Sequence, residues 1–149
     1  MIDKKTIQKF VRPSMFIIGK GVMASVAREA SLKIKEMAYI HCEGYSAHSL
    51  KHGPFALMTS GFPVILIVDE ENMEEMMNIY EQLCSRDANV YIISDSEEIV
   101  KKNNGIHFPR NNHGHLLCMV VLQCIAYSLC TFSGINPDRP RNLAKVVTV

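Results

Sequence analysis

Hydrophobic and polar residues follow two alternating patterns along this chain. Short, nearly continuous apolar runs are typical of strands covered on both faces of a sheet, whereas apolar residues three or four positions apart are typical of helices. These criteria predict strands at 14–21, 63–69, 89–95 and 105–109, and helices at 22–41, 71–86, 97–103 and 115–133. Because strands and helices alternate, we expect an α/β fold, a three-layer arrangement in which a parallel sheet has helices on both faces. No repeat or long linker interrupts residues 1–149, which are expected to form a single domain.

Two segments carry weaker patterns. The first residues alternate charged and apolar side chains and lack the apolar core of a secretory signal. Further on, a polar stretch around Gly44 leads into a second short helix from about Ser46. We expect the Gly-Pro pair at 53–54 to break or restart this helix.

Residues 116–132 are almost wholly apolar and could be read as a membrane span. The run is interrupted by Gln123, Ser128 and Thr131, and it is shorter than the ~20 residues that a span usually needs. We therefore expect no membrane role for this segment. A helix buried on most of its faces is the favoured interpretation.

Composition narrows the class of protein further. Sixteen basic and fifteen acidic residues leave a formal net charge of +1, which gives no overall attraction to nucleic acid or to an acidic membrane. The five cysteines are odd in number, form no Cys-x-x-Cys pair and lie mostly in apolar runs. This usage indicates reduced, buried thiols in a cytoplasmic protein.

Residues 19–24 have the form Gly-x-Gly-x-x-Ala between a predicted strand and a predicted helix. In a dinucleotide-binding fold such glycines let the backbone approach a phosphate at a helix N-terminus. That fingerprint also needs an acidic residue at the end of the next strand, about 20 positions on, and the first such residue here is Asp69. A tight turn with close helix packing is therefore favoured over nucleotide binding.

Potential metal ligands gather in a short segment, at His41, Cys42, Glu43, His48 and His52. This mixture of side chains could form a zinc site. The Gly-Pro pair that follows leaves the local geometry open, and no distant cysteine pair completes a tetrahedral set. Scattered polar or core histidines, or one catalytic histidine, are the favoured alternatives.

Lys33 and Glu36 are three positions apart on a predicted helix and share a face with Glu29. As a surface ion pair they would contribute roughly 0.2–0.5 kcal/mol. As a functional pair, Lys33 would keep the carboxylate ionised or neutralise a developing oxyanion, while Glu36 would act as a base. The spacing by itself favours the surface ion pair.

The residues from Pro137 to the end leave the final helix as an extended, Pro- and Arg-rich segment. A frayed terminus is the default expectation. An ordered tail would instead bring Lys145 to a site, because a lysine in a dehydrated pocket loses basicity and can form an imine with a carbonyl.

Three motifs together resemble a known family. They are Ser-Leu-Lys-Ile-Lys-Glu at 31–36 with Tyr-Ile-His at 39–41, Leu-Lys-His-Gly-Pro-Phe-Ala-Leu at 50–57, and Asp-Arg-Pro-Arg-Asn-Leu-Ala-Lys at 138–145. Their order and spacing are similar to those of the C-terminal sugar isomerase (SIS) domain of glutamine:fructose-6-phosphate amidotransferases, the glucosamine-6-phosphate synthases. The resemblance implies a flavodoxin-like sheet. It also implies an aldose–ketose chemistry that adds ammonia from glutamine to fructose 6-phosphate and gives glucosamine 6-phosphate for amino-sugar (UDP-GlcNAc) synthesis.

The resemblance implies a role for four residues. His52 would assist opening of the sugar ring, and Lys145 would form the imine with the ketose carbonyl. Glu36 would move a proton between carbons 1 and 2 of the sugar, and Lys33 would support its charge. Lys145 and Glu36 would contact the substrate, residues 138–149 would form an active-site tail, and neither a cofactor nor a metal is implied.

The resemblance also implies partners. In the family the ring-opening histidine is shared across a subunit interface, so we expect a homodimer, with the apolar helix at 116–132 as a candidate contact. Family members carry a glutaminase domain and a first SIS domain whose Ser/Thr-rich loop holds the substrate phosphate, and these 149 residues contain no such loop. We therefore expect the isolated chain to be an incomplete aminotransferase. The alternative is a non-catalytic sugar-phosphate-binding sensor or assembly module that kept the fold.

Overall fold

The computed structural model describes residues 2–143 and is built around a five-stranded sheet. The strands are β1 (Ser14–Gly19), β2 (His41–Ser46), β3 (Pro63–Val68), β4 (Asn89–Ser94) and β5 (Ile106–His107). Their order across the sheet is β2-β1-β3-β4-β5, and every neighbouring pair is parallel. This is the flavodoxin-like strand order, and it confirms the predicted fold class.

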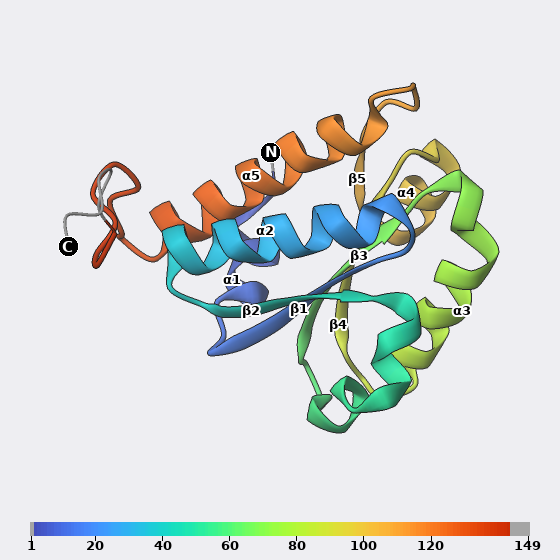
Figure 1. Ribbon diagram of the computed structural model, residues 1–149. Coiled ribbons are helices and arrows are strands. Elements are labelled where there is room, and N and C mark those ends of the chain that lie inside the picture. Colours follow the sequence, from blue (N-terminus) through green and yellow to red (C-terminus); the bar gives the residue numbers. More distant parts are fainter. Residues whose placement is uncertain (1, 144–149) are drawn as a thin grey trace.

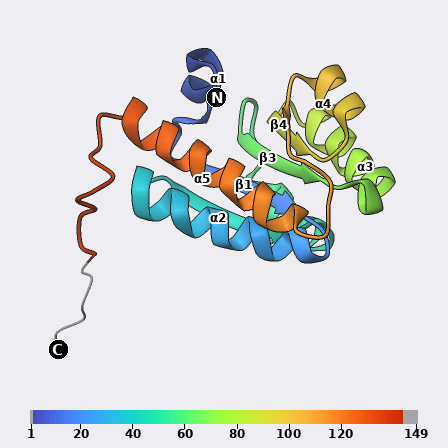
Figure 2. The same ribbon diagram turned by 90° about the horizontal axis from the view of Figure 1, so that it is seen from above.

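Helices cover both faces of the sheet (Figure 1). One face carries α1 (Lys4–Phe10), α2 (Val22–Ala38) and α5 (Gly114–Phe132). The other carries α3 (Met73–Cys84), α4 (Glu97–Asn103) and two 3-10 segments, η1 (Ala47–His52) and η2 (Pro54–Leu57), with a single turn, η3 (Glu70–Asn72), leading into α3. Figure 2 shows α2 and α5 side by side on the first face. We call the two faces the α2 side and the α3 side.

The alternation of side chains along the central strands separates two hydrophobic clusters. On β1, Met15 and Ile17 belong to the cluster of the α2 side, whereas Phe16 and Ile18 belong to the cluster of the α3 side. All six residues of β3 are buried. Since each face of the sheet has its own helical layer, a central strand is apolar on both faces, which explains the continuous apolar run predicted at 63–69.

The hydrophobic pattern does not predict β2. The predicted helix at 22–41 ends at Ala38, because Tyr39 adopts a left-handed backbone conformation with φ 57°. The polar stretch that follows is an edge strand paired only with β1, so it needs no continuous apolar run. It lies very close to α2, since a Cβ added at Gly44 would be 2.5 Å from the backbone of Ala27.

The pattern also does not predict α1. This helix begins after Asp3, whose carboxylate accepts hydrogen bonds from the amides of Lys5 and Thr6. Ile7 and Phe10 are buried in the cluster of the α2 side. The alternation of charged and apolar residues is thus that of a short amphipathic helix rather than of an irregular terminus.

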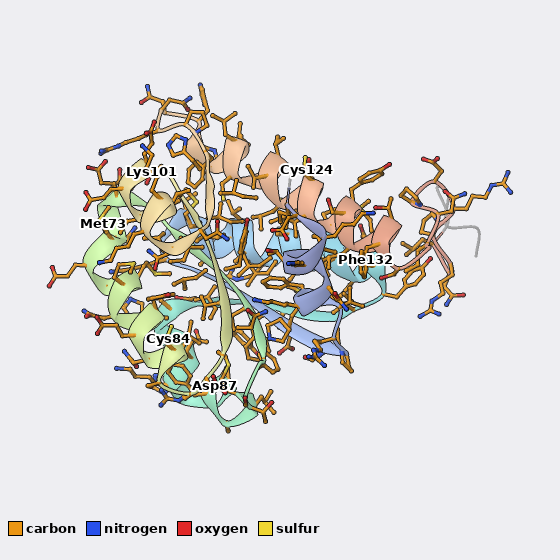
Figure 3. The ribbon with its side chains drawn as sticks, turned by 180° about the vertical axis from the view of Figure 1, so that it is seen from behind. Met73, Cys84, Asp87, Lys101, Cys124 and Phe132 are labelled. Carbon is orange, nitrogen blue, oxygen red and sulfur yellow. The ribbon has the colours of Figure 1, made fainter. Side chains whose placement is uncertain are left out.

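The prediction that the helix at 115–133 is buried on most faces is wrong. Only 33% of the most apolar window of α5 is buried. Its inner residues, such as Leu122, pack against α2, whereas Leu116, Val120 and Tyr127 are more than half exposed. Figure 3 shows Cys124 and Phe132 along this helix. By length and composition α5 could span a membrane, but within the described residues it packs against α2 and α1 with one face in the core.

All five cysteines are free thiols, but only three are buried. Burial raises the pKa of Cys42 and of Cys118 to about 12, and Cys130 is also covered. Cys84 and Cys124 are exposed, so the prediction of buried thiols is wrong for these two. Both lie on helices in the outer layers of the fold, α3 and α5, where a thiol can face away from the sheet.

Candidate functional site

Lys33 and Glu36 lie one helical turn apart near the end of α2, as their spacing predicts. Lys33 Nζ is 2.8 Å from Glu36 Oε2 and 3.5 Å from Glu29 Oε1. The side chains of Lys33 and Glu36 are 29% and 31% exposed. The hydrogen bond that Lys33 donates to Glu36 raises the pKa of the lysine. The pair therefore holds a fixed positive charge against a partly covered carboxylate.

Lys33 also lines a groove of about 970 Å³ between α1, α2 and α5. The walls are mainly apolar and include Ile7 from α1 and Tyr127 and Phe132 from α5. Sequence reasoning missed this groove because it depends on α1. The available signal was Asp3, an N-cap residue type placed before a short charged and apolar segment.

His52 lies on the α3 side. It ends η1, whose Ala47 and Leu50 are buried in the cluster of that side, and its own side chain is exposed. It lines a hollow of about 760 Å³ together with residues of α3, among them Glu75. Because Glu36 lies on the α2 side, the described part of one chain does not bring His52 to the Lys33–Glu36 pair.

An ion-pair cluster ties η1 to α3 and to the loop after β1. Glu75 of α3 accepts a hydrogen bond from Lys20, and its other carboxylate oxygen is 3.6 Å from His48 Nε2. The hydrogen bond from Lys20, assisted by the charges of Lys20, His48 and Lys51, lowers the pKa of Glu75. The segment that carries His52 is thus attached to the rest of the fold by charge as well as by apolar packing.

The Gly-x-Gly-x-x-Ala segment forms the tight turn from β1 to α2. Gly21 is the N-cap of α2 with φ 56°, and a Cβ at Gly19 would lie 2.4 Å from the carbonyl oxygen of Met23. The strand after α2 is β2, which ends at Ser46, so the relevant strand is not the one before Asp69 and it does not end in an acidic residue. These contacts favour the tight turn.

The possible metal ligands between 41 and 52 separate in the structure. His41 lies on the edge strand with its Nε2 4.0 Å from Glu43, whereas the Nε2 of His48, on η1, lies 3.6 Å from Glu75 of α3. Tyr45 donates a hydrogen bond to Glu43, which raises the pKa of the tyrosine to about 12. The described residues contain no group of three or more side chains suited to holding a metal ion.

The tail after α5 is described up to Leu143, and Lys145 lies outside the described residues. The described part passes the C-terminal end of α2, where Arg141 contacts Tyr39 (Figure 2). The described part of the tail thus lies at the helix end that carries Lys33 and Glu36. The role of Lys145 stays a prediction.

Comparisons with known proteins agree with this architecture. The family model described as "SIS domain" matches residues 10–131. A probable glutamine–fructose-6-phosphate aminotransferase (isomerizing) of Acanthamoeba polyphaga mimivirus is 44% identical over 91% of this chain and 23% of its own length. The glutamine–fructose-6-phosphate aminotransferase (isomerizing) of Sulfolobus acidocaldarius is 41% identical over 93% of this chain and 23% of its own. The chain thus spans about a quarter of these relatives.

Solved structures show the same fold. The C-terminal domain of glucosamine-fructose-6-phosphate aminotransferase from Francisella tularensis has a TM-score of 0.75 at 24% identity, over 91% of this chain and 40% of that one. A glucosamine-6-phosphate deaminase from Thermotoga maritima has a TM-score of 0.79 at 27% identity, over 97% of this chain and 44% of that one. The five-stranded parallel sheet, the matching family model and the aminotransferase relatives together show that this chain belongs to the SIS domain family.

Proposed function

We propose that the chain is the isomerase half of a glucosamine-6-phosphate synthase, which converts fructose 6-phosphate and ammonia to glucosamine 6-phosphate. The Lys33–Glu36 pair is the observation that carries this proposal, because it joins a charged lysine to a half-buried carboxylate beside a groove. The names of relatives up to 44% identical support the same reaction. Ammonia and the contacts to the substrate phosphate would come from domains of the kind that the family carries.

In this proposal Glu36 moves the proton between carbons 1 and 2 of the sugar. Lys33 donates a hydrogen bond of 2.8 Å to Glu36 and so holds the carboxylate in position. The same ammonium group stabilises negative charge that develops on the substrate oxygen. A positioned base of this kind contributes about 10²- to 10⁴-fold to a rate.

Two other residues, Lys145 and His52, are predicted to act in the reaction and are not part of the Lys33–Glu36 pair. Lys145, in an active-site tail formed by 138–149, forms an imine with the ketose carbonyl. His52 assists ring opening as a proton shuttle, which imidazole suits near neutral pH. Since His52 and Glu36 lie on opposite sides of the sheet, we propose that His52 acts in the site of a second copy.

The homodimer proposed here would be isologous, so that η1 of each copy meets the α2 side of the other. The exposed face of α5 is a candidate for part of the contact, because Leu116, Val120 and Tyr127 are large, apolar and more than half exposed. α5 contains no Asp, Glu, Lys or Arg, so two such faces would meet with little repulsion. Because all five thiols are free, we place this assembly in the cytoplasm.

The replacement Glu36→Gln tests the proposal. It keeps the size of the side chain and its hydrogen bonding to Lys33 but removes the base. Exchange of the carbon 1 proton of fructose 6-phosphate, followed by NMR in deuterated water, should fall about 100-fold or more. Binding of the sugar phosphate, followed by titration, should change little.

Glu29→Gln is the matched control, because Glu29 also faces Lys33 but is 52% exposed and lies further from it, at 3.5 Å. Exchange should be kept in this variant. A separately expressed first SIS domain of a relative should raise exchange in the unaltered chain and not in Glu36→Gln. Equal exchange in Glu36→Gln and the unaltered chain would favour the sensor or assembly module instead.

A further inference from the structure

Tyr39 and Arg141 make two contacts with each other although they are 102 positions apart. The amide nitrogen of Arg141 donates a hydrogen bond of 2.8 Å to the hydroxyl oxygen of Tyr39. The guanidinium carbon of Arg141 also lies 4.1 Å from the centre of the Tyr39 ring, a cation–π geometry. One interaction holds the backbone of the tail and the other holds its side chain.

The position of Tyr39 makes this contact relevant to the proposed site. Tyr39 is the C-cap of α2 and follows Glu36 by three positions, which is about 4.5 Å of helix rise. Lys145 follows Arg141 by four positions, and four residues of chain span at most about 14 Å. The tail is therefore attached next to the helix end that carries Glu36, four positions before Lys145 in the chain.

The backbone of Tyr39 sets the direction of its ring. Tyr39 has φ 57°, a left-handed conformation that ends α2 and that L-residues other than Asn or Asp seldom adopt. Packing of Ala38 and Ile40 on either side, both buried, holds the residue in this conformation. The backbone of Tyr39 is thus held at the C-terminal end of α2, which the tail passes (Figure 2).

We infer that Tyr39 is a positioning residue that anchors the tail through Arg141 at the C-terminal end of α2, and that the imine formation proposed for Lys145 depends on this contact. This inference rests on the proposed function for the role of Lys145. The attachment of the tail to Tyr39 does not depend on that role, so the attachment and the reaction of Lys145 can be measured separately.

Limited proteolysis measures the anchoring without any activity. Trypsin cuts after Arg141 and releases residues 142–149, and mass spectrometry follows the initial rate. Tyr39→Leu removes both contacts and should raise this rate about tenfold, whereas Tyr39→Phe keeps the ring and should raise it roughly threefold. Cutting after Lys35, within α2, reports loss of the fold and should stay unchanged in both variants.

Reductive trapping measures the imine formation proposed for Lys145. Lys145 Nζ attacks the carbonyl of fructose 6-phosphate with loss of water, and added borohydride delivers a hydride to the C=N bond, which leaves a stable secondary amine on the lysine. The yield of this product on the tail peptide should fall roughly threefold in Arg141→Ala, which removes the cation–π contact and keeps the amide hydrogen bond, and stay unchanged in Arg139→Ala. Arg139 is the matched control, because it is equally exposed and two positions away, and the structure shows it no contact with Tyr39.

The outcomes separate the two statements. Equal tryptic rates in Tyr39→Leu and the unaltered chain overturn the inference, and so does faster cutting with an unchanged yield of trapped Lys145. No trapped product in the unaltered chain overturns the proposed role of Lys145, and in that case the tryptic rates alone decide whether Tyr39 anchors the tail. Faster cutting together with a lower yield supports both.

Discussion

The α2 side and the α3 side share the same strands but carry different parts of the proposed site. On the α2 side, Lys33 and Glu36 are half-buried on a long helix beside an apolar groove. On the α3 side, His52 is exposed at the end of a 3-10 segment whose His48 lies 3.6 Å from Glu75 of α3. The difference teaches that one copy of this fold carries His52 and the Lys33–Glu36 pair on opposite faces of the sheet, so the shared site proposed above would need a second copy.

The largest expected effect is a difference in thiol reactivity between the two faces of α5. Cys118 is buried in the cluster of the α2 side and its pKa is raised to about 12, whereas Cys124 is exposed. Because the thiolate is the reacting form, iodoacetamide at pH 8 should modify Cys124 at least about 1000 times faster than Cys118. Peptide mass spectrometry over time measures both rates in one sample.

The same measurement bears on the dimer. If a second copy covers the outer face of α5, modification of Cys124 should slow as the protein concentration rises, while Cys118 stays unreactive. Similar rates for the two thiols in the folded chain would contradict the one-sided burial of this helix.

The next effect tests whether the two parts of the proposed site belong to different copies. Glu36→Gln and His52→Ala should each lower proton exchange about 100-fold. In an equal mixture, half of the dimers are mixed and each mixed dimer holds one intact site, so about a quarter of the full activity should return. Exchange measured by NMR before and after mixing gives the answer.

The recovery of proton exchange in the mixture can be tested with a further substitution. Val120→Glu introduced into both chains places a charge on the exposed face of α5, where Val120 is 53% exposed, so the fold should be kept. Recovery should disappear if this face is part of the contact. A mixture that stays inactive at every concentration would show that His52 and Glu36 do not act across copies.

The smallest effect concerns the charges of the α3 side. The pKa of Glu75 is lowered by the hydrogen bond from Lys20 and by the charges of Lys20, His48 and Lys51. A lowered carboxyl pKa contributes stability above its ordinary value of about 4.3 and loses it as the pH falls through the lowered value. Glu75→Gln should therefore lower the free energy of unfolding at pH 7 and make no difference in strong acid.

Urea denaturation at pH 7 and in acid measures this contribution. The loss should be small, because the side chain of Glu75 is 38% exposed and water screens the pair. Glu97→Gln, which removes a more exposed pair with Lys101 on α4, serves as the control and should lose less. A loss at pH 7 that persists unchanged in acid would point to packing rather than to charge.

The sequence predicts well whatever depends on neighbours along the chain. The buried strands at 63–69 and 89–95 follow from apolar runs, and the Lys33–Glu36 contact follows from a spacing of three on a helix. The elements at the edges are harder to predict, because β2 is mostly polar and α1 is short and half polar. Their formation depends on what they pack against, namely the β1 edge for β2 and the α2-side cluster for α1.

By itself, the sequence determines an α/β chain with a parallel sheet, the family motifs and one local charged pair, since all of these are encoded within single elements. Only the tertiary structure decides that His52 and Glu36 lie on opposite sides of the sheet, that α5 is covered on one face, and that Arg141 meets Tyr39. The physical reason is that strand order and layer packing bring together residues up to 102 positions apart. Local periodicity holds no information on which of these distant faces meet.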